Sequence, residues 1–247
     1  MLEPVKVGIG EYLSGFYASL VSTTKPMDEY IQRGVARSIA WAPSRMVDSA
    51  EEMLAAWQRN DTDSAPTRPP KLPVILVGMD QSYTPTAREY GAQIANSEKV
   101  IMPNDPKQRL FGLRTVFGDI RVQMVVAAAD EPTARSIAAQ LMLYMEAVPN
   151  RRVGYTTSFA GVSQYWVAMI ESTDVPAAAI HTGVKNIVML AVDITLKAQI
   201  PIYDAPKVGE PNDGKGVPGT DDPAGYPVVI RVDFDDKIMK QITTVSE

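Results

Sequence analysis

Alternating apolar and polar positions predict a β-hairpin near the middle of the chain. Residues 109–117 and 120–129 each have the pattern of a strand, and Gly118-Asp119 lies between them. Glycine accepts a positive φ, which suits the first central position of a two-residue hairpin turn. Because side chains alternate along a strand, one face of the second strand is apolar. That face contains Ile120, Val122, Met124 and Val126.

A helix is predicted directly after this hairpin, over residues 131–148. Asp130 can cap it, Glu131 suits the positive end of the helix dipole, and Pro132 is tolerated in the first turn. Apolar residues then recur at steps of three and four, which predicts one stripe packed on a sheet. The stripe consists of Ile137, Ala138, Leu141, Tyr144, Met145 and Val148, and Pro149-Asn150 ends the helix.

Four further segments have strand patterns: residues 73–79, 164–171, 186–200 and 226–234. Residues 164–171 are apolar on both faces, which predicts a central strand covered on both sides. Residues 186–200 keep one apolar face throughout, while the other face becomes polar from Asp193 onward. We therefore expect this strand to be covered on both sides at its start and open on one side at its end. Pro201 is expected to end its regular pairing.

The N-terminal third contains a short strand pattern and two helix patterns. Val5, Val7 and Ile9 alternate as in a strand. Residues 27–60 predict two helices separated at Pro43, with Ser44 capping the second. Its apolar face would contain Val47, Ala50, Leu54 and Trp57. The two helices either pack on the sheet of their own chain or dock against a neighbouring subunit. Residues 80–108 predict a long excursion with a short helix at 86–95.

This order of elements predicts an α+β fold with a mainly antiparallel sheet and helices packed chiefly on one face. We expect a single elaborated domain spanning residues 1–247. Its predicted parts are an N-terminal arm with helices at 1–60, a core sheet and helix at 73–203, an acidic loop at 204–226, and a C-terminal strand and tail at 227–247. A polar, proline-rich connector at 60–72 joins the first two parts.

Composition narrows the classes of function. The chain has 247 residues, of which 45% are hydrophobic and 21% charged, enough for a substantial folded core. Its net charge of −5 argues against a protein whose main task is to hold nucleic acid through phosphates. Cysteine is absent, which excludes disulfides, a thiolate nucleophile and a cysteine-based zinc site. Neither a signal-peptide pattern nor an apolar run long enough to span a bilayer is apparent, so no membrane partner is expected.

The candidate chemical motifs are weak. His181 is the only histidine, and the sequence identifies neither a nucleophile nor an orienting carboxylate for it. Gly8, Gly10 and Gly15 resemble a dinucleotide-binding spacing, but Leu13 occupies the position of the third glycine. The acidic pairs at 221–222 and 235–236 match no calcium loop and are expected to be solvated. We therefore predict no catalytic, cofactor or metal site, and a protein that is not an enzyme.

The run from Arg121 to Leu141 resembles the strand-to-helix unit of tail terminator and neck (collar) ring proteins of tailed bacteriophages. The resemblance implies a tail-terminator-like fold and a homo-oligomeric ring, most often a hexamer, at the head-proximal end of the tail. Such a ring terminates the tail, joins it to the head and lets DNA pass. Its implied partners are other copies of the chain, tail tube or sheath proteins, and neck or connector proteins. The implied location is the virion, after assembly in the host cytoplasm.

The hairpin is the predicted subunit contact. Phe111, Leu113 and Phe117 form an apolar face, and Arg114 and Arg121 can supply directional ion pairs. The arginines are equally consistent with ordinary solvent-facing positions. Terminator, collar and other neck rings all remain open, as do tube, sheath and head-completion proteins. The alternative from another class is a small-molecule-binding or enzymatic α+β domain. For a ring, the net charge of −5 and the acidic 204–226 loop suit a lumen wall to which DNA does not adhere, and both a lumenal and an exterior position of this loop remain open.

Overall fold

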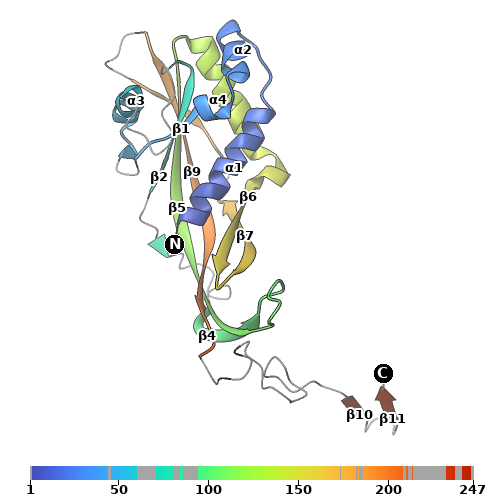
Figure 1. Cartoon of the computed structure of the whole chain (residues 1–247). Coiled ribbons are helices and arrows are strands. Elements are labelled where there is room, and N and C mark those ends of the chain that lie inside the picture. Colours follow the sequence, from blue (N-terminus) through green and yellow to red (C-terminus); the bar gives the residue numbers. More distant parts are fainter. Residues whose placement is uncertain are drawn as a thin grey trace. The chain divides into compact units, whose positions relative to one another are not determined.

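The computed structural model has an α+β fold with four α-helices and a curled, mixed but mostly antiparallel sheet, a half-barrel whose main path has six strands (Figure 1). This confirms the predicted α+β class and the mainly antiparallel sheet. The structure describes residues 2–43, 46–59, 71–80, 84–85, 94–172, 174–181, 183, 186–207, 210, 213, 232–236 and 241–245. Most of the predicted connector and of the predicted acidic loop lies outside these residues, as does residue 44, the predicted helix cap.

The chain divides into two compact units, where the sequence predicts a single domain. Unit 1 contains residues 1–93, 115–157 and 165–201. Unit 2 contains residues 94–114, 158–164 and 202–247. The division therefore cuts through the predicted core at 73–203, since its long strands contribute residues to both units.

The main path of the sheet runs in the order β1, β2, β5, β9, β7, β6. The bounds are β1 Ile39–Trp41, β2 Val74–Met79, β5 Leu110–Ala128, β9 Val188–Asp204, β7 Val162–Ile170 and β6 Arg152–Phe159. β1 runs parallel to β2, whereas β2 pairs antiparallel with β5 and β7 antiparallel with β9. The short strands β3 (Thr84–Pro85) and β8 (Ala177–Ile180) pair antiparallel with β5 and β9. The predicted strands at 73–79, 164–171 and 186–200 are confirmed as β2, β7 and β9.

The predicted hairpin at Gly118-Asp119 is wrong. Residues 110–128 form one continuous strand, β5, of 19 residues. Gly118 and Asp119 pair with Pro85 and Thr84 of β3 instead of turning the chain. Partners from distant parts of the sequence pair with this backbone, so the strand needs no local return. The alternation itself is correct, because Ile120, Val122, Met124 and Val126 all lie in the core.

The helix after β5 is confirmed as α4, Glu131–Glu146. The Asp130 side chain caps it by accepting a hydrogen bond from the backbone N–H of Thr133 at 2.9 Å. Ile137, Ala138, Leu141 and Met145 are buried, as the stripe predicts. Val148 lies beyond the helix and is 84% exposed, so the stripe ends one turn earlier than predicted.

The predicted N-terminal strand is wrong, because residues 3–18 form helix α1 (Glu3–Ala18). Val5, Ile9 and Leu13 are spaced by four residues and are buried, whereas Val7 is 55% exposed. The repeat is therefore helical, although its first members also alternate.

Two shorter helices replace the predicted pair at 27–60: α2 (Lys25–Gln32) and α3 (Ala50–Gln58). The end of the first predicted helix is instead strand β1, paired with the apolar β2. Ser49 directly precedes α3, whose Leu54 and Trp57 are buried as predicted.

The sheet of unit 1 carries helices on both faces. α1, α2 and α4 lie on one side of the sheet and α3 on the other (Figure 1). α1, α2 and α4 share one apolar core with Ile75 and Met124, whereas α3 shares a second core with Leu76 and Val125. Three of the four described helices therefore pack on one face of the sheet, and α3 packs on the other. Ile75 and Leu76 are consecutive residues of β2, and Met124 and Val125 are consecutive residues of β5. Each two neighbours lie in different cores because side chains alternate between the two faces of a strand.

Unit 2 contains β4 (Ile94–Ile101), the ends of the long strands, and a separate hairpin of β10 (Val232–Asp236) and β11 (Gln241–Val245). The predicted helix at 86–95 falls mostly outside the described residues, and its last two residues begin β4. Of the predicted strand at 226–234, residues 232–234 lie in β10. β9 continues through Pro201 to Asp204, so the expectation that pairing ends at this proline is wrong.

Candidate interaction surfaces

One face of β7 is apolar and exposed. Tyr165, Val167 and Met169 are 64%, 37% and 52% exposed. The alternate residues Ala168 and Ile170 are buried in the core shared with α4. The predicted burial of this strand on both sides is therefore wrong. None of the four described helices covers this side of β7, because α3 packs on β2, β5 and only the start of β9.

Neighbouring strands extend this surface within unit 1. Arg152 and Thr156 of β6 are exposed, with Gly154 between them. The Tyr165 ring lies over Gly154, where a Cβ would come within 2.0 Å of the Tyr165 hydroxyl oxygen. Lys197 of β9 pairs with Met169 across the strands, and its Nζ lies 2.9 Å from a carboxylate oxygen of Glu171. We call the following residues the open face: Arg152, Gly154, Thr156, Tyr165, Val167, Met169 and Lys197.

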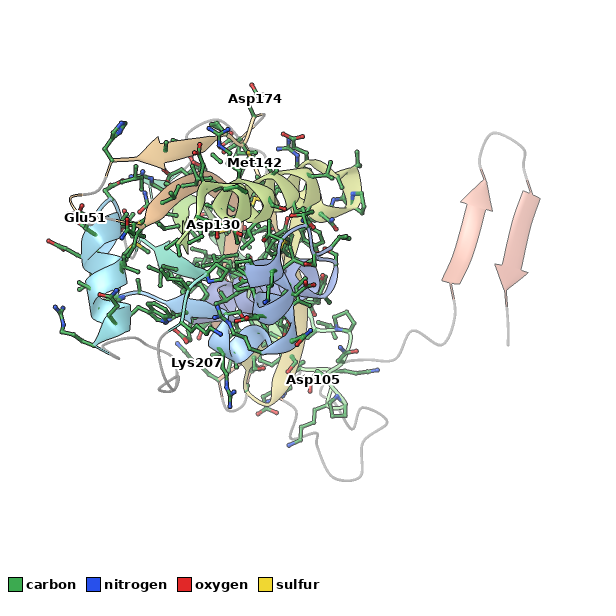
Figure 2. The ribbon with its side chains drawn as sticks, turned by 90° about the horizontal axis from the view of Figure 1, so that it is seen from above. Glu51, Asp105, Asp130, Met142, Asp174 and Lys207 are labelled. Atoms are coloured by element: carbon green, nitrogen blue, oxygen red, sulfur yellow. The ribbon has the colours of Figure 1, made fainter. Side chains whose placement is uncertain are left out.

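The outer side of α4 carries a second exposed apolar surface. Leu143 is 70% exposed, Ala139 is exposed, and Met142 is partly exposed (Figure 2). Glu146 continues this side by one turn, and Val148 follows the helix. We call these residues the helix ridge: Ala139, Met142, Leu143, Glu146 and Val148. Because α4 packs on the face of β7 that contains Ala168 and Ile170, the ridge and the open face lie on opposite sides of the sheet.

The segment at residues 21–24 fixes the flank of the helix ridge. The backbone N–H and C=O of Val21 exchange two hydrogen bonds of 2.9 Å with the Gln140 amide. Thr23 and Thr24 pair with Ser136 and Thr133 through their hydroxyl groups, at 2.6 and 2.7 Å. These contacts cover the polar flank of α4 and leave the ridge exposed.

Arg121, one of the predicted interface residues, forms its ion pairs within the chain. Its guanidinium donates to Asp48 at 2.7 Å and to Asp193 at 3.1 Å. The hydrogen bond with Asp48, helped by the charge of Asp193, raises the pKa of Arg121. Gln123 completes the arrangement, because its side-chain oxygen accepts the backbone N–H of Asp48 at 2.9 Å. These contacts join β5 and β9 to Asp48, which lies just before α3.

A pocket of about 490 Å³ lies beside these ion pairs and is strongly acidic. Glu51 at the start of α3 accepts the backbone N–H of Gly183 at 2.6 Å (Glu51 is marked in Figure 2). Asp48 and Asp193 are bound to Arg121. Protein donors therefore already bind three of the acidic groups that line the pocket.

The remaining predicted interface residues are distributed over both units. Phe111 is fully buried in unit 2, with its ring centre 6.0 Å from that of Phe159. Leu113 is half-buried and Arg114 is exposed in the same unit. Phe117, in unit 1, is half-buried. The continuous β5 strand removes the hairpin tip that would have grouped these residues, and their role at an interface stays a prediction.

Unit 2 is held by a buried ion pair next to its aromatic cluster. Arg109 donates from Nε and Nη2 to the two carboxylate oxygens of Asp105 at 2.9 and 3.1 Å, and also to the Ala160 carbonyl at 3.0 Å. Burial alone would raise the pKa of Asp105, but hydrogen bonds from Arg109 and from the backbone outweigh it and lower that pKa. The guanidinium of Arg109 also lies 5.0 Å from the centre of the Phe111 ring.

Metal and membrane features are sparse in the described part of the chain. It contains no group of three or more histidine, cysteine or acidic residues arranged to hold a metal, and His181 is exposed. None of its helices is both long and apolar enough to cross a bilayer. No protein-family model matches the chain, and no curated protein shows significant similarity to it.

Proposed function

We propose that this protein is a structural virion component that forms a ring at the head-proximal end of a phage tail. In this role it terminates the tail and joins it to the head while DNA passes through. The observation that carries the proposal is the open face, an apolar strand surface that none of the described helices covers, in a sheet whose other apolar faces pack against helices. Contiguous exposed apolar surface indicates a contact with another protein.

The proposed likeness to tail terminators rests on the unit formed by β5 and α4. β5 passes directly into a capped helix that packs across the sheet, in the order that the resemblance implies. β6 also ends the main path of the sheet. Closed ring symmetry would shield such edges from uncontrolled pairing.

The proposed assembly is a homo-oligomer, most simply a hexamer. Mass photometry of the purified chain, followed by negative-stain microscopy, tests it. The expected result is one dominant mass at a fixed multiple of 26.9 kDa and ring-shaped averages with a central opening. A protein that remains a 26.9 kDa monomer at every protein concentration tested would overturn the proposal.

A ligand-binding or enzymatic role is the second candidate, and the acidic pocket beside Arg121 favours it. Its volume of about 490 Å³ suits a small molecule. However, Arg121 and Gly183 already bind three of its acidic groups. Thermal-shift measurements with cationic small molecules test this role. Stabilisation that is lost in Asp193→Asn would favour a ligand site over a purely structural ion pair.

A further inference from the structure

We propose that the open face of one copy receives the helix ridge of the next copy, so that a single repeated head-to-tail contact builds the ring. The inference rests on the proposed function, since it names the contact that such a ring requires. It commits to one occupant for the open face, namely α4 of a second copy of this chain.

The positions of the two surfaces determine the symmetry of this contact. The open face and the helix ridge lie on opposite sides of the same sheet within unit 1. A two-fold contact of one surface with itself would bury only one of them and leave the other exposed. A contact between the two different surfaces buries both in every subunit, and its repetition closes a ring when the rotation between subunits allows it.

The chemistry of the surfaces is also complementary. The open face presents Tyr165, Val167 and Met169 beside the exposed cation Arg152. The ridge presents Met142 and Leu143 beside the exposed anion Glu146. Apolar groups therefore meet apolar groups, and a carboxylate can meet a guanidinium at the border of the contact. Such pairs set the orientation of an interface more than its strength.

Contacts between like surfaces lack this complementarity. On the open face Arg152 is an exposed cation, while the Lys197 ammonium is already paired with Glu171. On the outer side of α4 Glu146 is an exposed anion, while Arg135 is paired with Glu131. Two open faces or two ridges would therefore bring together surfaces of the same net charge, whereas the ridge brings a negative border to the positive border of the open face.

Tyr165 provides the anchor of the proposed contact. Its ring rests over Gly154, where a Cβ on residue 154 would lie 2.0 Å from the hydroxyl oxygen. The side chain is 64% exposed and is therefore accessible to a partner. Large aromatic side chains are typical of the residues that dominate interface energies.

Disulfide trapping can test this contact without background, because the chain contains no cysteine. Leu143→Cys and Val167→Cys are prepared separately, mixed and oxidised. The expected product is a disulfide-linked dimer of the two variants. The variant with both cysteines should give a ladder of crosslinked species on a non-reducing gel, and the largest species should contain as many chains as the ring. Val7→Cys and Ile101→Cys provide a matched control, since both sites are exposed and belong to neither surface.

Charge reversal supplies a second test that does not depend on cysteine geometry. Glu146→Arg and Arg152→Glu should each reduce the assembled fraction by about tenfold at low salt, because each replaces the complementary pair by two like charges, and the double variant should recover most of it. Both side chains are exposed, so folding should be unaffected.

Rings that form without the mixed disulfide and without charge rescue would overturn this inference and leave the proposed function standing. Dimers of Val167→Cys alone would also overturn it, by showing a contact between two open faces. Monomers under all conditions would overturn both.

Discussion

One face of the sheet in unit 1 has a covered half and an open half, and the two are built from similar residues. Under α3, Val125 and Met189 are at most 1% exposed. Beyond α3, Val167 and Met169 of β7 are 37% and 52% exposed. The exposed fractions differ because a helix covers one half, and not because the strand residues differ in hydrophobicity. An apolar strand face therefore indicates that something covers it, but not that the same chain does.

β9 crosses from the covered half to the open half, and its sequence follows the change. Met189 and Ala191 lie under α3, and the same face then becomes polar with Asp193, Thr195 and Lys197. β7 lies next to this polar stretch yet keeps Val167 and Met169. Since β9 becomes polar where α3 no longer covers it, the apolar face that β7 keeps beside it favours a contact with a partner.

Replacing one valine by aspartate in each half gives the largest expected contrast. Val125→Asp buries an unpaired carboxylate under α3 and should cost about 4 kcal/mol or more, enough to unfold unit 1. Val167→Asp should change the unfolding free energy by about 1 kcal/mol or less, because Val167 lies at the surface, yet abolish assembly. Circular dichroism melts and mass photometry measure the two effects. A folded Val167→Asp variant that still assembles would contradict the claim that the open half of this face is a subunit contact.

Two glycines of α1 test the packing of the helix-covered face. A Cβ at Gly8 would lie 2.3 Å from the carbonyl oxygen of Gly154, whereas a Cβ at Gly10 meets nothing within 4 Å. Gly8→Ala should destabilise the protein by about 1–3 kcal/mol, since the helix must shift away from β6. Gly10→Ala should stabilise it by about 0.5–1 kcal/mol through helix propensity. Urea unfolding of both variants gives the comparison, and equal effects would contradict the close approach of α1 to β6.

The ion pair of unit 2 should contribute stability that depends on pH. Asp105 has a lowered pKa in the folded protein, so its contribution is complete above the unfolded-state pKa of about 3.9 and is lost as the pH falls through the folded-state pKa. Asp105→Asn should lower the unfolding free energy of this unit by about 2 kcal/mol at pH 7. The difference should narrow below about pH 4. Hydrogen exchange of peptides around Phe111 and thermal melts from pH 3 to 7 measure it, and a difference independent of pH would contradict this role.

Phe117 tests the interface that the sequence predicts on β5. The side chain is half-buried in unit 1, so Phe117→Asp should lower stability by about 1–2 kcal/mol. If Phe117 belongs to a subunit contact, the variant should lose assembly under conditions where it is still folded. Normal assembly with only a lower melting temperature would assign Phe117 to the core of its own chain.

The smallest expected effect concerns DNA. A ring through which the genome passes should not retain it, and the net charge of −5 is consistent with a non-adhesive lumen. A gel-shift assay at physiological salt should show no shift of duplex DNA. Tight binding that weakens steeply with salt would instead support a nucleic-acid-binding function.

The elements that the sequence predicted correctly are those whose signals do not depend on distant partners. α4 has its cap, its proline and its stripe within one segment, and β9 is long enough for its alternation to be unambiguous. The start of α1 is ambiguous because Val5 and Ile9 fit both periods and Val7 adds the alternation of a strand, whereas Leu13 and Phe16 continue only the helical repeat. The predicted turn at Gly118-Asp119 is wrong because β5 pairs with strands far away in the sequence, and the sequence pattern does not show these partners.

The exposed apolar surfaces could not be predicted from the sequence for a related reason. Sequence alternation shows that both faces of β7 are apolar, but whether a helix covers the second face depends on where α3 ends. The stripe pattern likewise gives no sign of the exposed side of α4, since Met142 and Leu143 lie outside it. Both surfaces become apparent only when apolar character is compared with burial.

Hydroxyl-radical footprinting with mass spectrometry tests most directly whether the open face is a subunit contact. Tyrosine and methionine react readily when exposed, and the open face contains both Tyr165 and Met169. In the assembled state their oxidation should fall several-fold relative to the dilute or Val167→Asp protein, while buried Met124 stays protected in both states. Equal reactivity of Tyr165 and Met169 in assembled and dissociated protein would contradict a role for the open face in the ring.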